Sequence, residues 1–361
     1  MTADRIGVGM LGYAFMGKAH SRALLALRHL DVPLRPELVS ISGRDARAVE
    51  EARARWGWAE ATTDWREQVA DERIGLFVNG GPNAVHAEPT IAAARAGKHA
   101  LCEKPLGMSA AESHEMWQAA ERAAVHHMCG FNYRFVPAVR LARELLEAGE
   151  LGEVVHFRAR YLQSWGWDAD ASLWRFDPAQ AGTGALGDLG THVVGLARYL
   201  VGEIVSVSAR VRTIVPDRAV DDHVVATIEF ENGLLGTVEA SRLARGRINS
   251  NAFEVNGSKG SLAFDVERLN ELEVADTKSF RRVLVTEPEH PFMRHWWPPG
   301  HILGWGDTFT HQLAHLLEAI AGEHDVAPHG ATFEDGYRCD EVVEAMLRSA
   351  ESGRSEAVAS R

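Results

Sequence analysis

Short apolar runs alternate with amphipathic stretches over the first third of the chain. Runs that predict strands cover residues 6–11, 38–42, 74–79 and 99–102, and stretches that predict helices cover 18–30, 46–56, 85–96 and 109–125. Ser109 stands where the last of these helices needs an N-cap. Strands that alternate with helices are typical of a parallel sheet wound with helices on both faces, so we predict an α/β domain over residues 1–129.

The pattern changes after Gly152. Residues 154–161, 204–215, 224–230 and 235–240 have the composition of strands. Asn232-Gly233 supplies the positive-φ pair that a two-residue hairpin requires. Residues 130–361 are therefore predicted as an α+β domain with a mostly antiparallel sheet, and we leave open whether the C-terminal helix packs back on the first domain. The aromatic, proline-rich loop 291–306 is expected to pack against another element or a ligand.

Composition narrows the class of protein. The chain has 361 residues, 46% of them hydrophobic, and a formal net charge of −12, which disfavours a nucleic-acid partner. Its three cysteines lack the spacing of a disulfide framework or a zinc site. No apolar stretch is long enough to span a membrane, and the N-terminus has no leader pattern, so we expect an unprocessed cytoplasmic protein. Because the cysteines lack zinc-type spacing, we also expect no bound metal.

A dinucleotide-binding turn is predicted at residues 12–17. Gly7, Gly9 and Gly12 match the usual glycine spacing literally, but Gly7 and Gly9 fall inside the first strand. A phosphate-binding turn must follow the strand, where the next helix directs free N–H groups at the pyrophosphate. The alternative frame has Gly12 at the tight turn, Ala14 at the closest backbone approach and Gly17 at the contact between helix and strand.

The end of the second strand favours NADP mildly over NAD. An NAD enzyme usually places a carboxylate there to bind the ribose 2′-hydroxyl. This chain has Ser42-Gly43-Arg44, and Asp45 comes late. Ser42 can donate to a 2′-phosphate, and Arg44 or Arg47 can pair with its charge. The alternative is that Arg44 is an ordinary surface cation.

Two further segments carry candidate chemistry. Glu103-Lys104-Pro105 follows a strand at the carboxyl edge of the predicted sheet, where ligands bind in open α/β folds. Asp188 and His192 stand four residues apart in a predicted helix, an arrangement suited to acid–base catalysis. Taken alone, an Asp/His pair at this spacing is more often a capping or surface pair than a catalytic one.

Together these motifs resemble the glucose-fructose oxidoreductase/inositol dehydrogenase/rhizopine-catabolism (Gfo/Idh/MocA) family of sugar oxidoreductases. The resemblance covers nearly the whole chain. It rests on five segments: Phe15-Met16-Gly17-Lys18-Ala19-His20, Pro82-Asn83…His86, Glu103-Lys104-Pro105, Gly130-Phe131-Asn132-Tyr133-Arg134-Phe135 and Gly187-Asp188…Thr191-His192. Within the family, Tyr161-Leu162-Gln163…Trp165, Trp174-Arg175-Phe176 and Arg198-Tyr199-Leu200-Val201-Gly202 look most like the levoglucosan and pyranoside 3-dehydrogenases. Gly80-Gly81 departs from the Ala-Thr or Cys-Thr that usually precedes Pro-Asn.

The resemblance implies a Rossmann domain followed by a domain with a large open sheet that commonly forms oligomers, here a homodimer or homotetramer. It implies NAD(P) as cofactor, held by Gly12, Ala14, Phe15, Met16, Ser42, Gly43, Arg44, Arg47, Gly80, Gly81, Pro82, Asn83, His86, Glu103, Lys104 and Asn132. It implies a carbohydrate site lined by Lys104, Tyr133, Arg134, Tyr161, Gln163, Trp165, Trp174, Arg175, Asp188 and His192. The tryptophans are equally compatible with ordinary core positions.

The implied reaction interconverts a secondary alcohol and a ketone on a cyclic sugar, anhydrosugar, glycoside or inositol. Lys104, Asp188 and His192 are the expected catalytic residues, and the sequence leaves open whether Lys104 or His192 takes the hydroxyl proton. Two alternatives are an NAD-dependent glycosidase that acts by transient oxidation at C3 and a dinucleotide-binding regulator without catalysis.

Overall fold

The computed structural model describes residues 4–358, which form two compact units. Of the described residues, 4–132 and 304–337 form one unit, and 133–303 and 338–358 form the other. The boundary that we predicted near residue 129 falls close to the first division. Residues 304–337 are grouped with the first unit, and the helix α10 (Phe333–Ser352) begins in the first unit and ends in the second.

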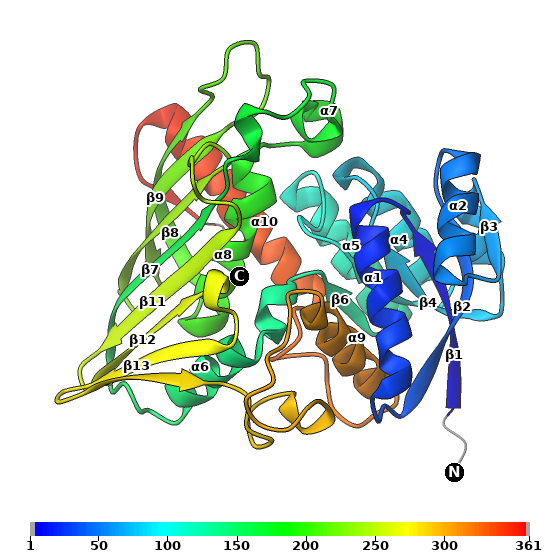
Figure 1. The fold of residues 1–361 in the computed structure, drawn as a ribbon. Coiled ribbons are helices and arrows are strands. Elements are labelled where there is room, and N and C mark those ends of the chain that lie inside the picture. The colour runs from blue at the N-terminus through cyan, green and yellow to red at the C-terminus, as the bar shows by residue number, and fades with distance from the viewer. Residues whose placement is uncertain (1–3, 359–361) are drawn as a thin grey trace. The chain divides into compact units, whose positions relative to one another are not determined.

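The first unit is built on a parallel sheet with the strand order β3-β2-β1-β4-β5-β6. Its strands are β1 (Asp4–Leu11), β2 (Leu34–Ser42), β3 (Glu60–Thr62), β4 (Ile74–Asn79), β5 (His99–Cys102) and β6 (His127–Cys129). Its helices are α1 (Phe15–Ala26), α2 (Ala46–Trp56), α3 (Trp65–Ala70), α4 (Ala87–Arg95), α5 (Ala110–Ala123) and α9 (Asp307–Ile320). Helices α1 and α2 cover one face and α4 and α5 the other (Figure 1). This is the predicted doubly wound arrangement.

The second unit is built on a mostly antiparallel sheet with the order β14-β13-β12-β11-β7-β10-β9-β8-β15, in which only β7 and β10 pair in parallel. Its strands are β7 (Val154–Leu162), β8 (Ile204–Arg212), β9 (His223–Phe230), β10 (Leu235–Ser241), β11 (Ser250–Gly257), β12 (Gly260–Asp265), β13 (Glu271–Asp276), β14 (Phe280–Leu284) and β15 (Glu356–Ala357). Its helices are α6 (Pro137–Glu147), α7 (Pro178–Ala181) and α8 (Thr191–Leu200). The large, mostly antiparallel sheet confirms the predicted fold class.

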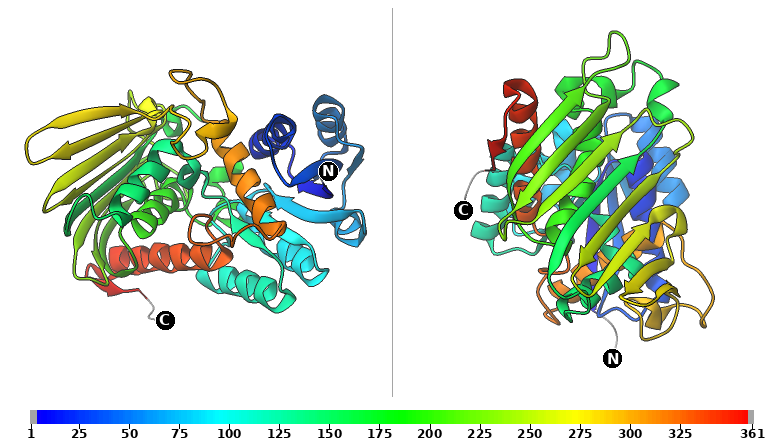
Figure 2. Two further views of the ribbon diagram at one scale, coloured as in Figure 1. Left: turned by 90° about the horizontal axis from the view of Figure 1, so that it is seen from below. Right: turned by 90° about the vertical axis from the view of Figure 1, so that its left-hand side faces the viewer.

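Burial differs between the two sheets. In β4 five of six residues are buried, as expected for a strand with helices on both faces. In β9 buried residues alternate with exposed or half-buried ones, so only one face of that sheet belongs to the core. Figure 2 shows helices over that face and the opposite face without a covering helix. The second sheet therefore presents one broad open face.

Two predicted details were wrong. The β9–β10 hairpin has a three-residue loop, with the Gly233 N–H bonded to the Phe230 carbonyl at 2.8 Å, and only Gly233 has a positive φ, of 81°. This is a type I turn with a glycine bulge, and the Asn232 side chain accepts from the Leu234 N–H at 3.1 Å. Strand β8 ends at Arg212, because the N–H groups of residues 214 and 215 are bound by the Asp222 carboxylate.

Candidate functional site

The predicted dinucleotide turn lies between β1 and α1. Gly12 has a φ of 106°, and a Cβ there would lie 2.6 Å from the Gly80 carbonyl oxygen. A Cβ at Gly17 would lie 2.3 Å from the Gly12 carbonyl oxygen, so both positions require glycine. Gly7 and Gly9 lie inside β1, which confirms that their literal glycine pattern is not the turn.

The N-terminus of α1 lacks the side-chain cap that several helices of the first unit have. Helices α2, α3 and α5 are each capped by a side chain, from Asp45, Asp64 and Ser109 respectively. The first turn of α1 has no side-chain cap and no acidic residue, and Ala14 and Phe15 are exposed beside it. Its N–H groups and positive dipole end therefore fit the pyrophosphate of a dinucleotide.

The end of β2 fits the predicted 2′-phosphate site only in part. Ser42 is fully buried and its hydroxyl donates to Gln68 Oε1 at 2.8 Å, so it does not face solvent. Asp45 accepts from the N–H groups of Arg47 and Ala48, which places a carboxylate at the start of α2. Arg47 is exposed and pairs with Glu51, whereas Arg44 is exposed and makes no ion pair within the described residues. Arg44 is thus the remaining cation for a 2′-phosphate.

The ring of Tyr13 lies against Gly43. A Cβ at Gly43 would lie 2.3 Å from two carbons of that ring. An aspartate at this position, the NAD-type residue, could enter only if Tyr13 moved. Substitution of Arg44 is therefore the cleaner test of cofactor choice.

The Gly80-Gly81 departure has a steric cause. The Gly80 N–H donates to the Leu11 carbonyl at 2.8 Å, which brings this loop against the end of β1. A Cβ at Gly80 would lie 2.9 Å from Met10 Cε, and one at Gly81 would lie 2.5 Å from Val85 Cγ2. The loop continues through Pro82 and the buried Asn83. Larger residues at 80 and 81 would require the Met10 and Val85 side chains to move.

The Glu103 carboxylate connects the loop after β5 to α1 through a contact with His20. His20 Nε2 lies 2.8 Å from Glu103 Oε1, and both side chains are buried. A Cβ at Gly130 would come within 2.9 Å of the carboxylate, so glycine is required there to leave room for it. Three segments that carried the family resemblance therefore meet at one carboxylate.

His86 fastens the other side of the same loop. Its Nδ1 lies 2.8 Å from the Pro105 carbonyl oxygen and its Nε2 lies 3.1 Å from that of Gly81. Burial lowers the pKa of His86, so the ring is neutral near pH 7 and donates to one of these carbonyls. The half-buried Lys104 is thus carried by a backbone segment held at Glu103 and at Pro105.

Part of the aromatic loop packs beside the turn, as expected. Trp305 stacks on Phe15 with ring centroids 5.6 Å apart. Its carbonyl accepts from Thr308, whose hydroxyl accepts from the buried Asn132 side chain at 2.9 Å. Asn132 is therefore anchored within the first unit, and Phe15 has an aromatic partner at the start of α1.

In the second unit, Asp188 lies in a π-helical turn (Leu186–Gly190) that leads directly into α8. The Asp221 carboxylate accepts from the N–H groups of Gly184 and Leu186 at 2.6 and 2.7 Å. A Cβ at Gly184 would lie 1.7 Å from the Asp221 carbonyl oxygen. The predicted helix is present, but its first turn is wider than an α-helix, a feature frequent at functional sites.

The Asp188 carboxylate pairs with an arginine that the sequence reading missed. Arg242 Nη2 lies 3.0 Å from Asp188 Oδ2, and Arg175 Nε lies 3.9 Å from the same oxygen. The Arg242 side chain is 1% exposed and that of Asp188 is 20% exposed. Arg242 follows β10 and is 54 positions away in sequence, and no motif marks it.

Two tyrosines surround His192. The Tyr133 ring meets the His192 ring edge to face at 4.9 Å, and the Tyr161 ring lies 5.7 Å from it. The two phenol groups are hydrogen-bonded at 2.8 Å. Burial raises the pKa of Tyr161, so its hydroxyl stays protonated.

A chain of polar groups continues from Tyr161. Its hydroxyl donates to Asn249 Oδ1 at 2.7 Å, and Gln163 Nε2 donates to the same oxygen at 2.7 Å. Trp165 Nε1 donates to Gln163 Oε1. Asn249 lies in a loop without a recognisable pattern and was not predicted. The cluster of Tyr133, Tyr161, Gln163, Trp165 and Asn249, with His192, is called the polar cluster below.

Trp174, Arg175 and Arg134 are further predicted substrate residues. The Arg175 guanidinium stacks on Trp174 at 4.5 Å, and Trp174 is half-buried. Arg134 is 3% exposed and its guanidinium faces the Tyr199 ring at 4.9 Å. Direct contact of Arg134 with a substrate stays a prediction, since its described partner is a ring of α8.

A group of potential metal ligands lies on α9 and the following turn. His315, Glu318 and His324 each place one ligand-type atom within 4.8 Å of the others. The two imidazoles are stacked, with centroids 4.3 Å apart and planes 23° apart. Because an ion lies in the plane of the ring that binds it, stacked rings do not share one ion without reorientation. We assign no metal to this cluster.

Comparisons with known proteins agree with these features. Residues 6–131 match the oxidoreductase family model with an NAD-binding Rossmann fold, and residues 139–263 match the GFO/IDH/MocA C-terminal domain. The chain is 39% identical to levoglucosan dehydrogenase from Pseudarthrobacter phenanthrenivorans over 96% of each chain. It is 44% identical, with a TM-score of 0.94, to the structure of an oxidoreductase domain protein from Kribbella flavida, over 99% of this chain and 100% of that one. With levoglucosan dehydrogenase in complex with NADH and levoglucosan, the identity is 40% and the TM-score 0.95 over the same shares. No helix within residues 4–358 is long and apolar enough to cross a membrane.

Proposed function

The chain belongs to the GFO/IDH/MocA oxidoreductase family, and from this premise we propose that it oxidises a secondary ring alcohol of a neutral sugar-like substrate to the ketone. The observation that carries the proposal is the polar cluster around His192. It combines phenol and amide groups with an indole ring, which suits a polyhydroxylated ring with apolar C–H faces. The Asp188 carboxylate, paired with Arg242, is an acceptor that suits a ring hydroxyl, and the similarity to levoglucosan dehydrogenase favours an uncharged ring.

The first unit supplies a fitting place for NAD(P). Gly12, Gly17 and the uncapped start of α1 suit the pyrophosphate, and Ala14, Phe15, Met16, Gly80, Gly81, Pro82 and Asn83 belong to the loops beside it. The bound cofactor supplies the hydride acceptor. Glu103 and His86 hold the segment that carries Lys104, and Asn132 is held by Thr308.

The chain's own residues then have separable roles. We assign Lys104 and His192 to the reacting hydroxyl, one to take its proton and the other to donate to the oxygen as negative charge develops. Asp188 orients a neighbouring hydroxyl. Tyr161, Gln163, Trp165, Trp174 and Arg175 are assigned to the rest of the ring.

A substrate screen tests the proposal. Cyclic polyols, anhydrosugars, pyranosides and hexose phosphates are offered with NAD or NADP, and the absorbance of the reduced nicotinamide is followed. We expect turnover of neutral rings, including levoglucosan, and at least about tenfold lower kcat/KM for phosphorylated sugars. Turnover of sugar phosphates alone would contradict the proposed substrate class.

Use of both cofactors, with a modest preference for NADP, is the second part of the proposal. Because Ser42 is buried and Arg47 is paired, Arg44 is the group expected to meet a 2′-phosphate. An exposed cation–phosphate contact predicts that Arg44→Ala lowers kcat/KM for NADP about fivefold and leaves that for NAD unchanged. Arg55→Ala, an exposed residue in the last turn of α2, is the matched control. A wild type that prefers NAD tenfold or more, with a ratio that Arg44→Ala does not alter, would show that Arg44 is only surface charge.

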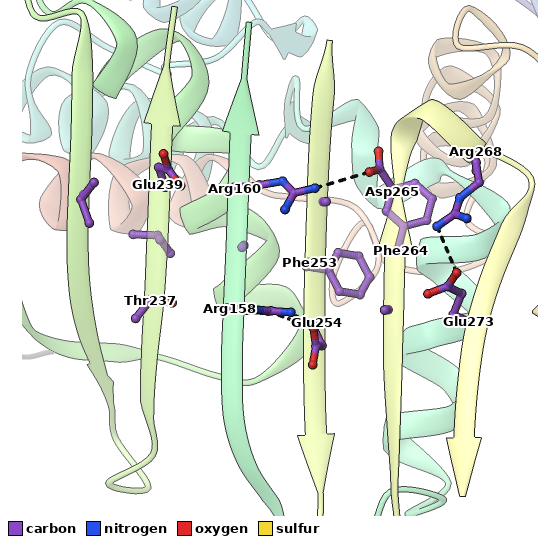
Figure 3. Close-up of a pocket in the computed structure, with 15 residues that line it drawn as sticks. Arg158, Arg160, Thr237, Glu239, Phe253, Glu254, Phe264, Asp265, Arg268 and Glu273 are labelled. Atoms are coloured by element: carbon purple, nitrogen blue, oxygen red, sulfur yellow. Dashed lines mark hydrogen bonds and ion pairs between the residues drawn. The ribbon is translucent and has the colours of Figure 1, made fainter. Parts of the chain in front are cut away.

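Homo-oligomerisation through the open face of the second sheet is the third part. This face carries a hollow of about 520 Å³ lined by charged and apolar residues of β7 and β9–β13 and by Arg268, which lies between β12 and β13. Figure 3 shows Arg160 directed at Asp265, 3.7 Å away, and Arg158 beside Glu254. Alternating acidic and basic groups let such a face pair with a second copy of itself.

Charge reversal on this face tests the assembly. Arg160→Glu places like charges beside Asp265, so we expect the protein to elute as a smaller species in size-exclusion chromatography with light scattering. Arg28→Glu, an exposed residue of the first unit, should elute like wild type. A monomeric wild type at micromolar concentration would contradict the proposed oligomer.

A further inference from the structure

The partner of Asp188 is held more rigidly than a surface ion pair. The Arg242 N–H donates to the Asp222 carbonyl at 3.0 Å, which fixes the backbone directly after β10. Its Nη1 donates to the Arg175 carbonyl at 3.2 Å and its Nη2 donates to Asp188 at 3.0 Å. A side chain that is 1% exposed, with a guanidinium bound through both Nη1 and Nη2, has little freedom to turn toward solvent.

Aromatic rings complete the surroundings of Arg242. Its guanidinium lies 4.9 Å from the Trp165 ring and 6.0 Å from the Phe176 ring, and these two rings stack on each other at 5.6 Å. Trp165 also donates to Gln163 in the polar cluster. One cation therefore contacts both the carboxylate of Asp188 and an indole that we assign to the sugar face.

We infer that Arg242 is a positioning residue for the proposed oxidation: it fixes the Asp188 carboxylate as an oriented hydrogen-bond acceptor and supports Trp165 beneath the ring. This inference rests on the proposed function. It assigns Asp188 to orientation and leaves proton removal to Lys104 or His192, because a carboxylate paired with a buried guanidinium is a stabilised anion and a weak base.

Substitutions at Arg242 separate positioning from general structural support. Arg242→Met keeps most of the side-chain volume and removes the charge, and we expect kcat/KM for the sugar to fall by about 30-fold or more, with NADH affinity within about twofold of wild type. Arg242→Lys restores a cation without the planar fork and should recover part of that loss. Arg245→Met is the matched control, because Arg245 forms an exposed pair with Asp168 and lies over Trp167.

A double-mutant cycle tests whether Arg242 acts through Asp188. In the Asp188→Asn background, Arg242→Met should cost no more than about threefold in kcat/KM, since the carboxylate that Arg242 positions is already lost. The double variant, in which both residues are uncharged, should also unfold at a higher temperature than Arg242→Met alone. The test therefore remains valid if the single variant folds poorly. Additive losses in kcat/KM, or wild-type kinetics in folded Arg242→Met, would overturn the inference.

The cycle also distinguishes the two levels of the account. If wild type oxidises neutral rings and the losses are additive, this inference fails while the proposed function stands. If wild type oxidises no ring alcohol, the proposed function fails, and the inference fails with it, whatever coupling the pair shows in thermal unfolding.

Discussion

Replacement of Lys104 or His192 by alanine is expected to lower kcat by about 100-fold or more while NADH still binds. Both side chains are assigned to the oxygen of the reacting alcohol. Their loss therefore removes interactions that strengthen as the carbinol C–H bond breaks and the hydride is transferred. Lys104 stands on a segment that Glu103 and Pro105 hold in place, and His192 is enclosed by Tyr133 and Tyr161. Truncation at either position should therefore leave the fold intact.

Steady-state kinetics with a saturating ring alcohol and fluorescence titration with NADH measure the two effects separately. Lys259→Ala and His29→Ala replace exposed residues of the same types and should behave like wild type. Near-normal kcat in either Lys104→Ala or His192→Ala would remove that residue from the reaction. A large loss of NADH affinity would instead place it at the cofactor.

Substitution of Gly17 by alanine is expected to weaken NADH binding about 100-fold or more. The new methyl group would lie 2.3 Å from the Gly12 carbonyl oxygen, and backbone on both sides of that contact leaves no flexible side chain to yield. To relieve this contact, the β1–α1 turn must open. The first N–H groups of α1 then no longer point at the pyrophosphate.

Gly97→Ala is the matched control for Gly17→Ala. Gly97 has a φ of 76° and nothing within 4 Å of an added Cβ, so this change should cost about 1 kcal/mol of stability without altering cofactor affinity. Circular dichroism verifies folding, and NADH titration gives the affinities. Wild-type NADH affinity in Gly17→Ala would mean that the pyrophosphate binds elsewhere.

Much of the first unit was predictable because its signals are local. Helix α2 and strands β4 and β5 have the predicted boundaries, since helical periodicity, the Asp45 cap and runs of buried apolar residues coincide there. Ser109 caps α5 as expected. Helix α1 starts at Phe15 and not at Lys18, because its first turn is placed by the glycine turn and exposes Phe15, so apolar periodicity does not reveal it.

The second unit was less predictable because its contacts connect distant segments. Strands β11–β14 follow loops of varied length, and none was located individually from the sequence. The motifs of the first unit converge because carboxyl ends of parallel strands meet at one edge of a sheet. Arg242 and Asn249 reach the polar cluster only through the pairing of β10 with β7 and β7 with β11, which no local pattern encodes.

Residue type alone does not show whether a polar side chain is accessible to a ligand. Ser42 has the right residue type for a phosphate donor, but Gln68 takes its hydroxyl inside the first unit. For Arg134, whose guanidinium faces the Tyr199 ring, contact with a sugar hydroxyl stays a prediction. The case of Ser42 shows that a polar residue beside a motif needs its exposure before its role can be assigned.

Hydride transfer from a labelled substrate tests the central claim most directly. A ring alcohol that the screen identifies is prepared with deuterium at the carbinol carbon and incubated with the wild-type protein and NAD or NADP. We predict that one ring ketone forms for each nicotinamide reduced, and that the deuterium appears at the nicotinamide C4 in the mass and proton spectra. Release of an aglycone without net cofactor reduction, or reduced cofactor without deuterium, would contradict the account.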